Sequence, residues 1–453
     1  MKTIIFVLIL FISNVMRLDA EENEIRIHLH TQEALSPLYL GKIQSDGGTL
    51  SADYLKKLFE VLQFDLNHNG FTKVSLVKDD LEKALEEKNP QLVFKHDFWE
   101  KSRMAFVVKP YLVQKQFNCY VYCAKKGSLK QYKEIPLTGD LNQDRRQIHR
   151  LSDSIQKELF NVMGVANSRI LFSKQKSKSP NEKNSWQSEI WECDFDGANE
   201  KQVTHEGSYS ITPVMLPPHP YFGKDRFMYV SYKIGQPKIY QSSLKEQTGK
   251  RIIDLRGNQL LPAISPKRDK IAFICDASGR ADLFIQQINA EGHLMEKPAQ
   301  LYSFPKATQA SPTFSPDGSK IAFVSDKDGS PRIYLIPSTI GMSRAEPIMI
   351  TKQNRENICP AWSPDGTKLA FSAKTKDIRQ LWIYDFGTKE ETQLTFGPGN
   401  KENPCWAPDS LHIVFNSTDP NSSELYIVNL NQPEAVKITR GPGKKHYPAW
   451  GIR

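Results

Sequence analysis

A tripeptide of the form Pro-x-aromatic, or Pro-x followed by another apolar residue, recurs six times in the C-terminal part of the chain. The copies start at residues 213, 262, 312, 360, 404 and 448, so by subtraction they are spaced 49, 50, 48, 44 and 44 residues apart. A period of this size is typical of repeat architectures, in which each repeat is one supersecondary unit. The C-terminal part of the chain is therefore predicted to use one structural unit six times.

Each repeat contains the turns and strands of a small antiparallel sheet. Asp-Gly follows the Pro-x-aromatic strand at 317–318 and at 365–366, between two apolar segments. Glycine accepts the positive φ angles of tight hairpin turns, so each pair predicts a turn between two strands. After the second of these strands, the copy that starts at Pro312 predicts further strands at 333–335 and 350–351. Four short strands in each repeat are typical of the blade of a β-propeller.

The phase of the repeat predicts how the propeller closes. In each repeat, a Pro-x-aromatic strand is followed by a turn and then by a second strand. The earliest of these second strands, at 170–172, has no Pro-x-aromatic strand before it. The last Pro-x-aromatic strand, at 448–450, has only a short tail after it. Because the two half-blades complement each other, we expect the C-terminal strand to pair with 170–172. An all-β, six-bladed propeller over residues 168–453 follows.

The region before the propeller begins with an apolar run. Residues 4–12 are apolar and follow Lys2, which is typical of a secretory signal peptide. The run is too short to cross a bilayer as a helix. Residues 1–20 are therefore predicted to be a signal peptide, and the mature chain to begin near Glu21.

Residues 21–165 are expected to form a small α/β domain. Strand-like runs lie at 74–77, 104–108 and 117–122. Two helices are predicted from apolar residues at helical spacing. Their apolar positions are Leu55, Leu58, Phe59, Leu62 and Leu66, before an expected C-cap at Gly70, and Ile148, Leu151, Ile155 and Leu159, before Gly164.

Three groups of polar residues could be metal-binding or catalytic, but a structural role is favoured for each. The segment 65–70, Asp-Leu-Asn-His-Asn-Gly, matches the first half of a calcium-binding loop, but Leu76 stands where a bidentate Glu is required. His149 and Asp153 share a helix face without a third partner in sequence, so surface hydrogen bonding or domain packing is expected. The segment 194–197, Asp-Phe-Asp-Gly, is expected to be a hairpin and not a metal loop.

Composition and cysteine spacing favour binding over catalysis. The chain has no Gly-x-Ser-x-Gly pentapeptide of the kind found in propeller-bearing peptidases. Its six cysteines have no zinc-site spacing and are expected to be free, mostly buried thiols, so no metal or cofactor is predicted. The net charge of +9 fits a solvated excess or an anionic membrane or cell-wall surface, and no nucleic acid is expected. The basic insertion at 174–183 is expected to be a mobile loop.

Three segments resemble the TolB family, the periplasmic component of the Tol-Pal cell-envelope system. Residues 65–71, Asp-Leu-Asn-His-Asn-Gly-Phe, are similar to the family's Asp-Leu-x-x-Ser-Gly-x-Phe. Residues 145–153 are similar to its Arg-x-x-Ala-His-x-x-Ala-Asp helix, and Ser-Arg-Ile at 168–170 to its Thr-Arg-Ile-Ala link to the propeller. With the terminal Pro-Ala-Trp, the resemblance extends over nearly the whole mature chain and departs from the family at Asn69, Ile148 and Ser152.

The resemblance implies a non-enzymatic periplasmic adaptor without a cofactor. It implies that the propeller face docks the peptidoglycan-associated lipoprotein Pal. The outer membrane and peptidoglycan are thereby linked to the inner-membrane Tol complex, for envelope integrity and constriction at cell division. The resemblance also implies that the mature N-terminal segment, about residues 21–31, engages TolA or folds back to modulate Pal binding.

The residues just before each Pro-x-aromatic strand are the candidate partner-binding residues. Loops of one type gather on one rim of a closed propeller, and amide side chains there can bond to a partner's backbone. The alternative is that these residues are solvated turns. The candidates, all expected in rim loops, are Asn258, Gln259, Leu261, Gln309, Ala310, Ser311, Asn357, Ile358 and Asn403.

Two other functions stay open at this point. One is an enzyme that processes envelope glycans or peptides within the propeller funnel, and the other is a propeller that binds small peptides. Convergent carboxylates or histidines in the central channel would favour the enzyme. Uncharged walls lined by amides would favour docking.

Overall fold

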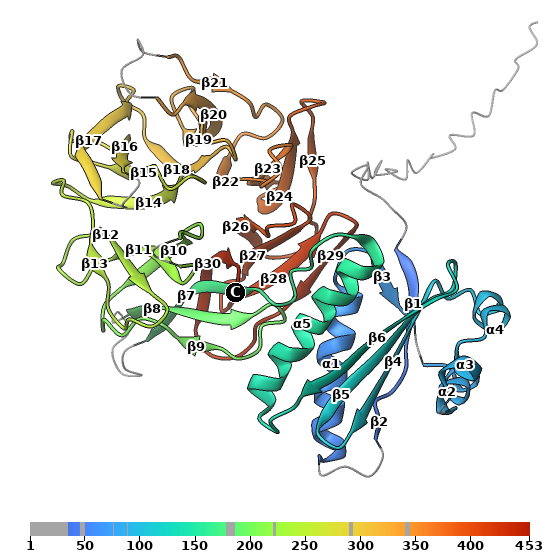
Figure 1. Ribbon diagram of the computed structural model, residues 1–453. Helices are drawn as coiled ribbons and strands as arrows, with labels where there is room; N and C mark the ends of the chain where they lie inside the picture. Colours follow the sequence, from blue (N-terminus) through green and yellow to red (C-terminus); the bar gives the residue numbers. More distant parts are fainter. Residues whose placement is uncertain are drawn as a thin grey trace, which may run out of the picture.

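The computed structural model describes residues 35–45, 50–75, 77–87, 89–177, 186–220, 223–289, 293–339 and 345–453. Here an N-terminal α/β unit precedes a six-bladed β-propeller, as predicted (Figure 1). The predicted signal peptide and the segment 21–31 lie outside the described residues. Of the helices in the described ranges, none has both the length and the apolar character that a membrane span needs.

The N-terminal unit is built on one mixed, six-stranded sheet. Its order is β3-β1-β4-β5-β6, with β2 paired to β4. β1 runs parallel to β3 and β4, whereas β4, β5 and β6 are antiparallel neighbours. The strands are β1 (Ser36–Leu40), β2 (Gln44–Ser45), β3 (Thr72–Val74), β4 (Phe106–Val113), β5 (Gln116–Cys123) and β6 (Ser128–Pro136).

Helices cover both faces of this sheet. Successive residues of a strand point to opposite faces, so Leu38 packs under the long helices and Tyr39 under the short ones. The long helices are α1 (Ala52–Asn67) and α5 (Leu141–Phe160), and the short ones are α2 (Asp79–Glu86), α3 (Pro90–Val93) and α4 (His96–Lys101).

Three element ends in this unit differ from the sequence predictions. α1 has its C-cap at His68, and Gly70 lies in the turn beyond it. α5 is capped by Asn161, whose left-handed φ of 57° takes the role expected nearer Gly164. The strand expected at 74–77 ends at Val74.

The propeller consists of six four-stranded antiparallel sheets. We number the blades from the one that holds the C-terminal strand. Blade 1 contains β30 (Lys444–Gly451), β7 (Arg169–Ser177), β8 (Trp186–Asp194) and β9 (Lys201–Gln202). Blade 2 contains β10 (Ser210–Met215), β11 (Arg226–Ser231), β12 (Lys238–Ser243) and β13 (Lys250–Arg251). Blade 3 contains β14 (Gln259–Ile264), β15 (Lys270–Cys275), β16 (Asp282–Ile288) and β17 (Leu294–Tyr302).

The other three blades follow in chain order. Blade 4 contains β18 (Gln309–Phe314), β19 (Lys320–Ser325), β20 (Arg332–Pro337) and β21 (Ile348–Met349). Blade 5 contains β22 (Asn357–Trp362), β23 (Lys368–Thr375), β24 (Ile378–Asp385) and β25 (Glu391–Gln393). Blade 6 contains β26 (Asn400–Trp406), β27 (His412–Thr418), β28 (Ser423–Asn429) and β29 (Gln432–Lys437).

The C-terminal strand closes the ring, as the phase of the repeat predicted. β30 pairs antiparallel with β7, from Lys444 opposite Gln175 to Gly451 opposite Arg169. β30 also packs between β26 and β10, so the first strands of all six blades form the inner wall. Trp450 fixes the closure, because its indole N–H donates to Ser168 Oγ at 2.8 Å.

Two smaller predictions in the propeller are corrected. The fourth strand of blade 4 was expected at 350–351, but it is β21 and ends at Met349. Thr351 lies beyond this strand, and its hydroxyl accepts a hydrogen bond from the Ile333 N–H at 3.0 Å. The predicted loop at 174–183 does not begin at Lys174, because β7 continues to Ser177. Lys174 is buried and paired with Glu200. The rest of that segment, from residue 178, lies outside the described residues.

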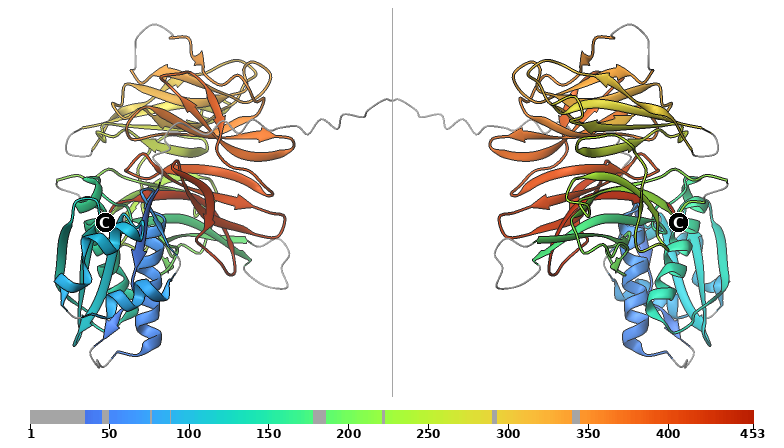
Figure 2. Two further views of the ribbon diagram at one scale, coloured as in Figure 1. Left: turned by 90° about the vertical axis from the view of Figure 1, so that its right-hand side faces the viewer. Right: turned by 90° about the vertical axis from the view of Figure 1, so that its left-hand side faces the viewer.

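The N-terminal unit packs beside blades 1 and 6, away from blades 3 and 4 (Figure 2). His412 is the first residue of β27, directly after the β26–β27 turn, and its Nε2 lies 2.7 Å from the His68 carbonyl oxygen. Asn431 Nδ2, between β28 and β29, donates to Gly70 O at 2.9 Å. These turns join first to second and third to fourth strands, so they lie on one face of the disc. The first strands begin on the opposite face.

Candidate functional site

The inner wall repeats a bulge that the proline of each copy requires. Proline has no N–H and cannot take part in the strand ladder, so each first strand shifts register at this point. The residue before every proline has a left-handed φ of about +50°, a conformation that costs a non-glycine residue on the order of 1 kcal/mol. These residues are Thr212, Leu261, Ser311, Cys359, Asn403 and Tyr447.

A buried polar residue stands three positions before each of these prolines. Gln259 is fully buried, and its amide donates to the carbonyl oxygens of Ile253 and Leu255 in the preceding loop. Lys401 Nζ donates to the carbonyls of Gly397 and Gly399 in the same way. Such bonds satisfy loop carbonyls inside the protein and fix the loop. The six residues are Ser210, Gln259, Gln309, Asn357, Lys401 and Lys445.

The structure corrects the predicted position of most candidate partner-binding residues. Asn258 precedes β14, but the others lie within first strands, so the prediction that they occupy rim loops is wrong. The physical reason is that three of the amides, Gln259, Gln309 and Asn357, are at most 1% exposed. The residues placed in strands are Gln259 and Leu261 in β14, Gln309, Ala310 and Ser311 in β18, Asn357 and Ile358 in β22, and Asn403 in β26.

Left-handed residues of neighbouring blades meet at the inner wall. Cys359 Sγ donates to Asn403 Oδ1 at 3.2 Å, and Asn403 Nδ2 donates to Asn416 Oδ1 at 2.8 Å. Burial raises the pKa of the Cys359 thiol to about 11, and it raises the pKa of Tyr447 to about 12. Both groups therefore stay uncharged at neutral pH.

Charged side chains at the boundary of blades 5 and 6 are paired with one another. Arg379 Nη2 lies 3.1 Å from Glu356, and Arg379 Nε lies 3.5 Å from Glu402. Lys374 Nζ lies 3.3 Å from Glu356. Burial raises the pKa of Glu402, and Arg379 opposes that rise. The acidic and basic side chains at this rim therefore form one network of ion pairs.

His149 lies in the junction between the N-terminal unit and blade 1. It is fully buried, with Nδ1 2.8 Å from Asp65 Oδ2 and Nε2 4.0 Å from Asp194 Oδ2. Burial lowers its pKa, but the Asp65 carboxylate outweighs burial, so the net shift is upward. Of the two roles expected for His149 and Asp153, domain packing is the one the structure supports for His149.

A possible metal cluster at this junction is already neutralised by arginines. In the described ranges, His149, Asp194 and Asp196 place ligand atoms within 4.8 Å of one another. Arg145 pairs with Asp196, and Arg453 pairs with Asp194. Asp194 and Gly197 form the predicted hairpin, closed by the Gly197 N–H to Asp194 O bond at 2.9 Å. These ion pairs fit packing between the N-terminal unit and blade 1 better than they fit a metal site.

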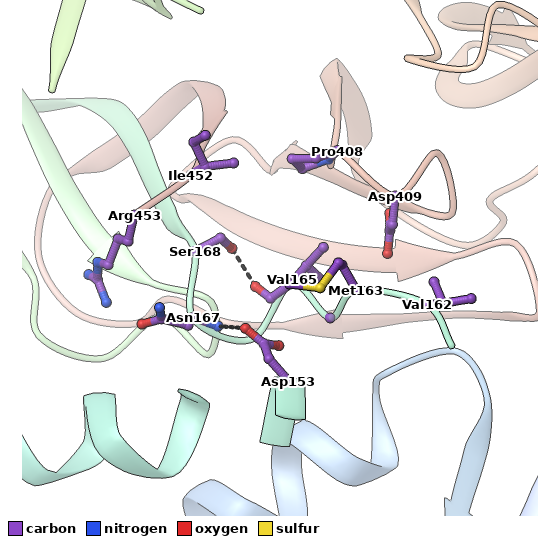
Figure 3. A pocket seen from close by; sticks show the side chains of 11 residues that line it. Asp153, Val162, Met163, Val165, Asn167, Ser168, Pro408, Asp409, Ile452 and Arg453 are labelled. Atoms are coloured by element: carbon purple, nitrogen blue, oxygen red, sulfur yellow. Dashed lines mark hydrogen bonds between the residues drawn. The ribbon is translucent and has the colours of Figure 1, made fainter. Parts of the chain in front are cut away.

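Asp153 holds the segment that links α5 to the propeller. Its carboxylate accepts hydrogen bonds from the Ala166 and Asn167 N–H groups at 2.8 and 3.0 Å. Burial raises its pKa to about 6, against the effect of these two bonds. Asp153 faces a cavity of about 440 Å³ between α5, the turn before β27 and the C-terminal residues (Figure 3). The cavity lies where the N-terminal unit, the link and the closing strand meet.

The six cysteines are free thiols, and they do not share one environment. Cys119, Cys193 and Cys275 are buried, while Cys123, Cys359 and Cys405 are partly exposed. The segment 65–70 shows no calcium-loop geometry, because Asp65 and Asn67 belong to α1. Asn69 Oδ1 instead accepts the N–H groups of Phe71 and Thr72, both at 2.9 Å.

Sequence comparison places the propeller in a known family. A family model described as "TolB beta propeller domain" matches residues 157–451. A TolB homolog from Protochlamydia amoebophila is 47% identical over 390 residues, which cover 84% of this chain and 82% of the relative. A TolB homolog from Chlamydia trachomatis serovar D is 34% identical and covers 84% of this chain and 80% of the relative.

A shorter match and a solved structure agree with this assignment. A TolB homolog from Chlamydia caviae is 42% identical over 274 residues, which cover 60% of this chain and 62% of the relative. The crystal structure of TolB from Acinetobacter baumannii has a TM-score of 0.74 at 19% identity. It covers 93% of this chain and 98% of that structure, and so shows a shared fold. On the match at 157–451 and the relative that is 47% identical, the chain belongs to the TolB family.

Proposed function

We propose that this protein is a non-enzymatic periplasmic adaptor of the Tol-Pal system that docks the lipoprotein Pal on its propeller. The observation that carries the proposal is the arrangement of the disc. The N-terminal unit contacts the face formed by the turns after first and third strands. The first strands begin on the opposite face, and each of them carries one left-handed residue on the inner wall.

This face is ordered before any partner arrives. Asn258 is held at both its backbone N–H and its amide by Asp276, at 2.6 and 2.7 Å. Thr308 is held by Asp326 in the same way, at 2.7 and 2.9 Å. Because the loops are already fixed, docking costs less conformational entropy. A rigid rim of this kind supports recognition of a folded domain.

The inner wall supports docking over the alternative of an enzyme in the funnel. Cys359, Asn403 and Tyr447 are neutral, and Glu402 is paired with Arg379. A hydrolase or lyase would instead use groups that exchange a proton near neutral pH and converge on an open site. Neutral side chains that form hydrogen bonds suit binding to a partner's backbone better than they suit acid–base catalysis of bond cleavage.

The remaining parts of the proposal follow from family membership. Pal binds peptidoglycan, so docking Pal would place the protein between the outer membrane and the inner-membrane Tol complex. The mature N-terminal segment at 21–31 would engage TolA or modulate Pal docking. Export to the periplasm and a role in envelope integrity and constriction at cell division belong to the same proposal.

Calorimetry of the mature protein with the cognate Pal domain tests this function. Leu261 and Ile358 lie near the starts of β14 and β22, pack in part against the blade cores and are partly exposed. The double variant Leu261→Ala/Ile358→Ala, tested at a temperature where it is folded, should weaken binding at least tenfold, or about 1.4 kcal/mol. Leu129→Ala removes an exposed leucine from β6 in the N-terminal unit and should leave affinity unchanged. No binding by the wild-type protein would refute the adaptor function. Equal loss in both variants would refute the face assignment.

A further inference from the structure

The residue eight places before each proline of the repeat is exposed on the face where the first strands begin. Each of these residues lies in the connection from the last strand of one blade to the first strand of the next. All six connections fall within the described ranges. The position is therefore at the rim in every blade, while the residue type changes from blade to blade. The six residues are His205, Asp254, Phe304, Lys352, Phe396 and Arg440.

The residue before this position holds its backbone in place. In four connections it is a buried threonine, whose hydroxyl accepts a hydrogen bond from an N–H group of the third strand at 2.8 to 3.0 Å. These threonines are Thr204, Thr351, Thr395 and Thr439. Before Phe304 the equivalent residue is Ser303, whose Oγ accepts a hydrogen bond from Arg280 Nη2 at 2.8 Å. Because the backbone is already fixed, contacts made by the exposed side chains cost less conformational entropy.

Four of these residues follow one another around the ring and alternate between aromatic and cationic side chains. Phe304 and Phe396 precede blades 4 and 6, whereas Lys352 and Arg440 precede blades 5 and 1. The first strands of blades 4, 5, 6 and 1 are neighbours in the closed ring. We call these four residues the rim arc. The positions before blades 2 and 3 are a histidine and an aspartate, so the pattern is confined to one part of the rim.

The phenylalanines of the rim arc are exposed to solvent. Phe304 is 37% exposed and Phe396 is 56% exposed. In the described ranges one other phenylalanine, Phe98 in α4, is exposed to a similar extent, at 38%. The Phe304 ring is also contacted by Lys327, whose Nζ lies 5.7 Å from the ring centre. Aromatic side chains on an ordered backbone are typical anchors of protein interfaces, because they fill pockets on the partner.

The two cations of the rim arc are not paired with any carboxylate of the described residues. Neither Lys352 nor Arg440 forms an ion pair within those ranges. Glu356, in the same connection as Lys352, is instead paired with Arg379, at 3.1 Å. The charges of Lys352 and Arg440 can therefore attract carboxylates of a partner, and they would repel a basic surface.

We propose that the rim arc selects the partner that docks on this face. The surface that it fits carries apolar pockets opposite Phe304 and Phe396 and carboxylates opposite Lys352 and Arg440. The inference rests on the proposed function, in which the partner is the Pal domain, and adds which residues decide the fit. It also places the main contacts on one part of the rim. An anionic glycan polymer would fit less well, since the phenylalanines separate the two cations.

Calorimetry with the cognate Pal domain tests the aromatic residues. Phe304→Ala and Phe396→Ala should each weaken binding about threefold, and the double variant about tenfold. Phe98→Ala is the matched control, because it removes a similarly exposed ring from the N-terminal unit. It should leave affinity unchanged. The Tm of all these variants should match that of the wild type, since each side chain is exposed.

Association kinetics with the same domain test the cations. Lys352→Glu/Arg440→Glu should slow association about tenfold at low salt, and the difference from wild type should shrink as salt is added. Lys245→Glu/Lys389→Glu is the matched control. It makes the same change of charge at exposed positions in the turns between third and fourth strands, on the opposite face of the disc. This control should leave the association rate nearly unchanged.

The outcomes separate the rim arc from the function on which it rests. No binding by the wild-type protein would refute the adaptor function and the rim arc together. Wild-type binding that the phenylalanine variants leave unchanged would refute the rim arc alone. Equal slowing by the two charge reversals would assign the effect to net charge. If Lys352→Glu/Arg440→Glu lost sedimentation with purified peptidoglycan but kept wild-type Pal binding, the cations would be assigned to an anionic polymer instead.

Discussion

Gly197 is the residue where the hairpin after β8 touches blade 6. Its φ is 82°, and a Cβ added there would lie 1.8 Å from the carbonyl oxygen of Ile438. The backbone of one blade would have to move to admit it. Gly197→Ala should therefore lower the free energy of unfolding by more than about 3 kcal/mol, measured by denaturant titration.

Gly139 supplies the matched control for this substitution. Its φ is 90°, but no heavy atom lies within 4 Å of the Cβ position. Gly139→Ala should carry only the backbone penalty, about 1 kcal/mol. Equal losses at the two glycines would contradict the close approach at Gly197.

His412 should make the stability of the domain junction depend on pH. Burial lowers its pKa, but Asp409, with Oδ2 2.6 Å from Nδ1, outweighs burial, so the net pKa lies above 6.5. A raised pKa gives stability that is complete below pH 6.5 and is lost as pH rises through the folded value. The difference in unfolding free energy between wild type and His412→Gln should therefore shrink from pH 6 to pH 9.

An exposed histidine, His96, provides the control for this prediction. His96 lies 3.9 Å from Glu100 with about half of its side chain exposed. His96→Gln should change stability by less than about 0.5 kcal/mol across the same pH range. A wild-type advantage over His412→Gln that grows with pH would contradict the assigned pair.

At the scale of elements, β30 should hold the whole ring together. Deletion of residues 441–453 exposes the edge of β7 and removes the indole that bonds to Ser168. The truncated chain should lose its cooperative thermal transition, and a synthetic peptide of residues 441–453 should restore part of it. An unchanged Tm after truncation would show that the ring does not depend on this strand.

The strands of the propeller could be predicted because hydrophobic burial repeats with the blade. Phe273, Phe323, Phe371 and Phe415 are equivalent second-strand residues, and all are fully buried. Polar residues were harder to place. Gln259 was expected to bind a partner from a rim loop because polarity alone does not distinguish a surface amide from one that satisfies buried carbonyls. The regular position of a polar residue three places before each proline was the signal that could have located it.

The junction could be predicted only in part for a related reason. The helical spacing predicted the elements that carry His149, and domain packing was one of its expected roles. Its partner Asp65, however, is 84 residues away along the chain. Such pairs are set by how two helices and a blade pack together, which local patterns do not encode.

At the scale of the whole molecule, we expect the two faces of the propeller to have different tasks. One face carries the N-terminal unit through the turns of blades 1 and 6. The other is proposed to receive Pal. Hydrogen bonds between neighbouring blades, such as that from Cys359 to Asn403, hold the inner wall together. The protein is therefore expected to act as a rigid connector.

Hydrogen exchange of the mature protein with and without the cognate Pal domain tests this account most directly. The account predicts slower exchange at the starts of β14, β18, β22 and β26 and in the loops that precede them. Exchange in the turns that contact the N-terminal unit should not change. Protection confined to those turns, or no protection at all at a Pal concentration that saturates binding, would contradict it.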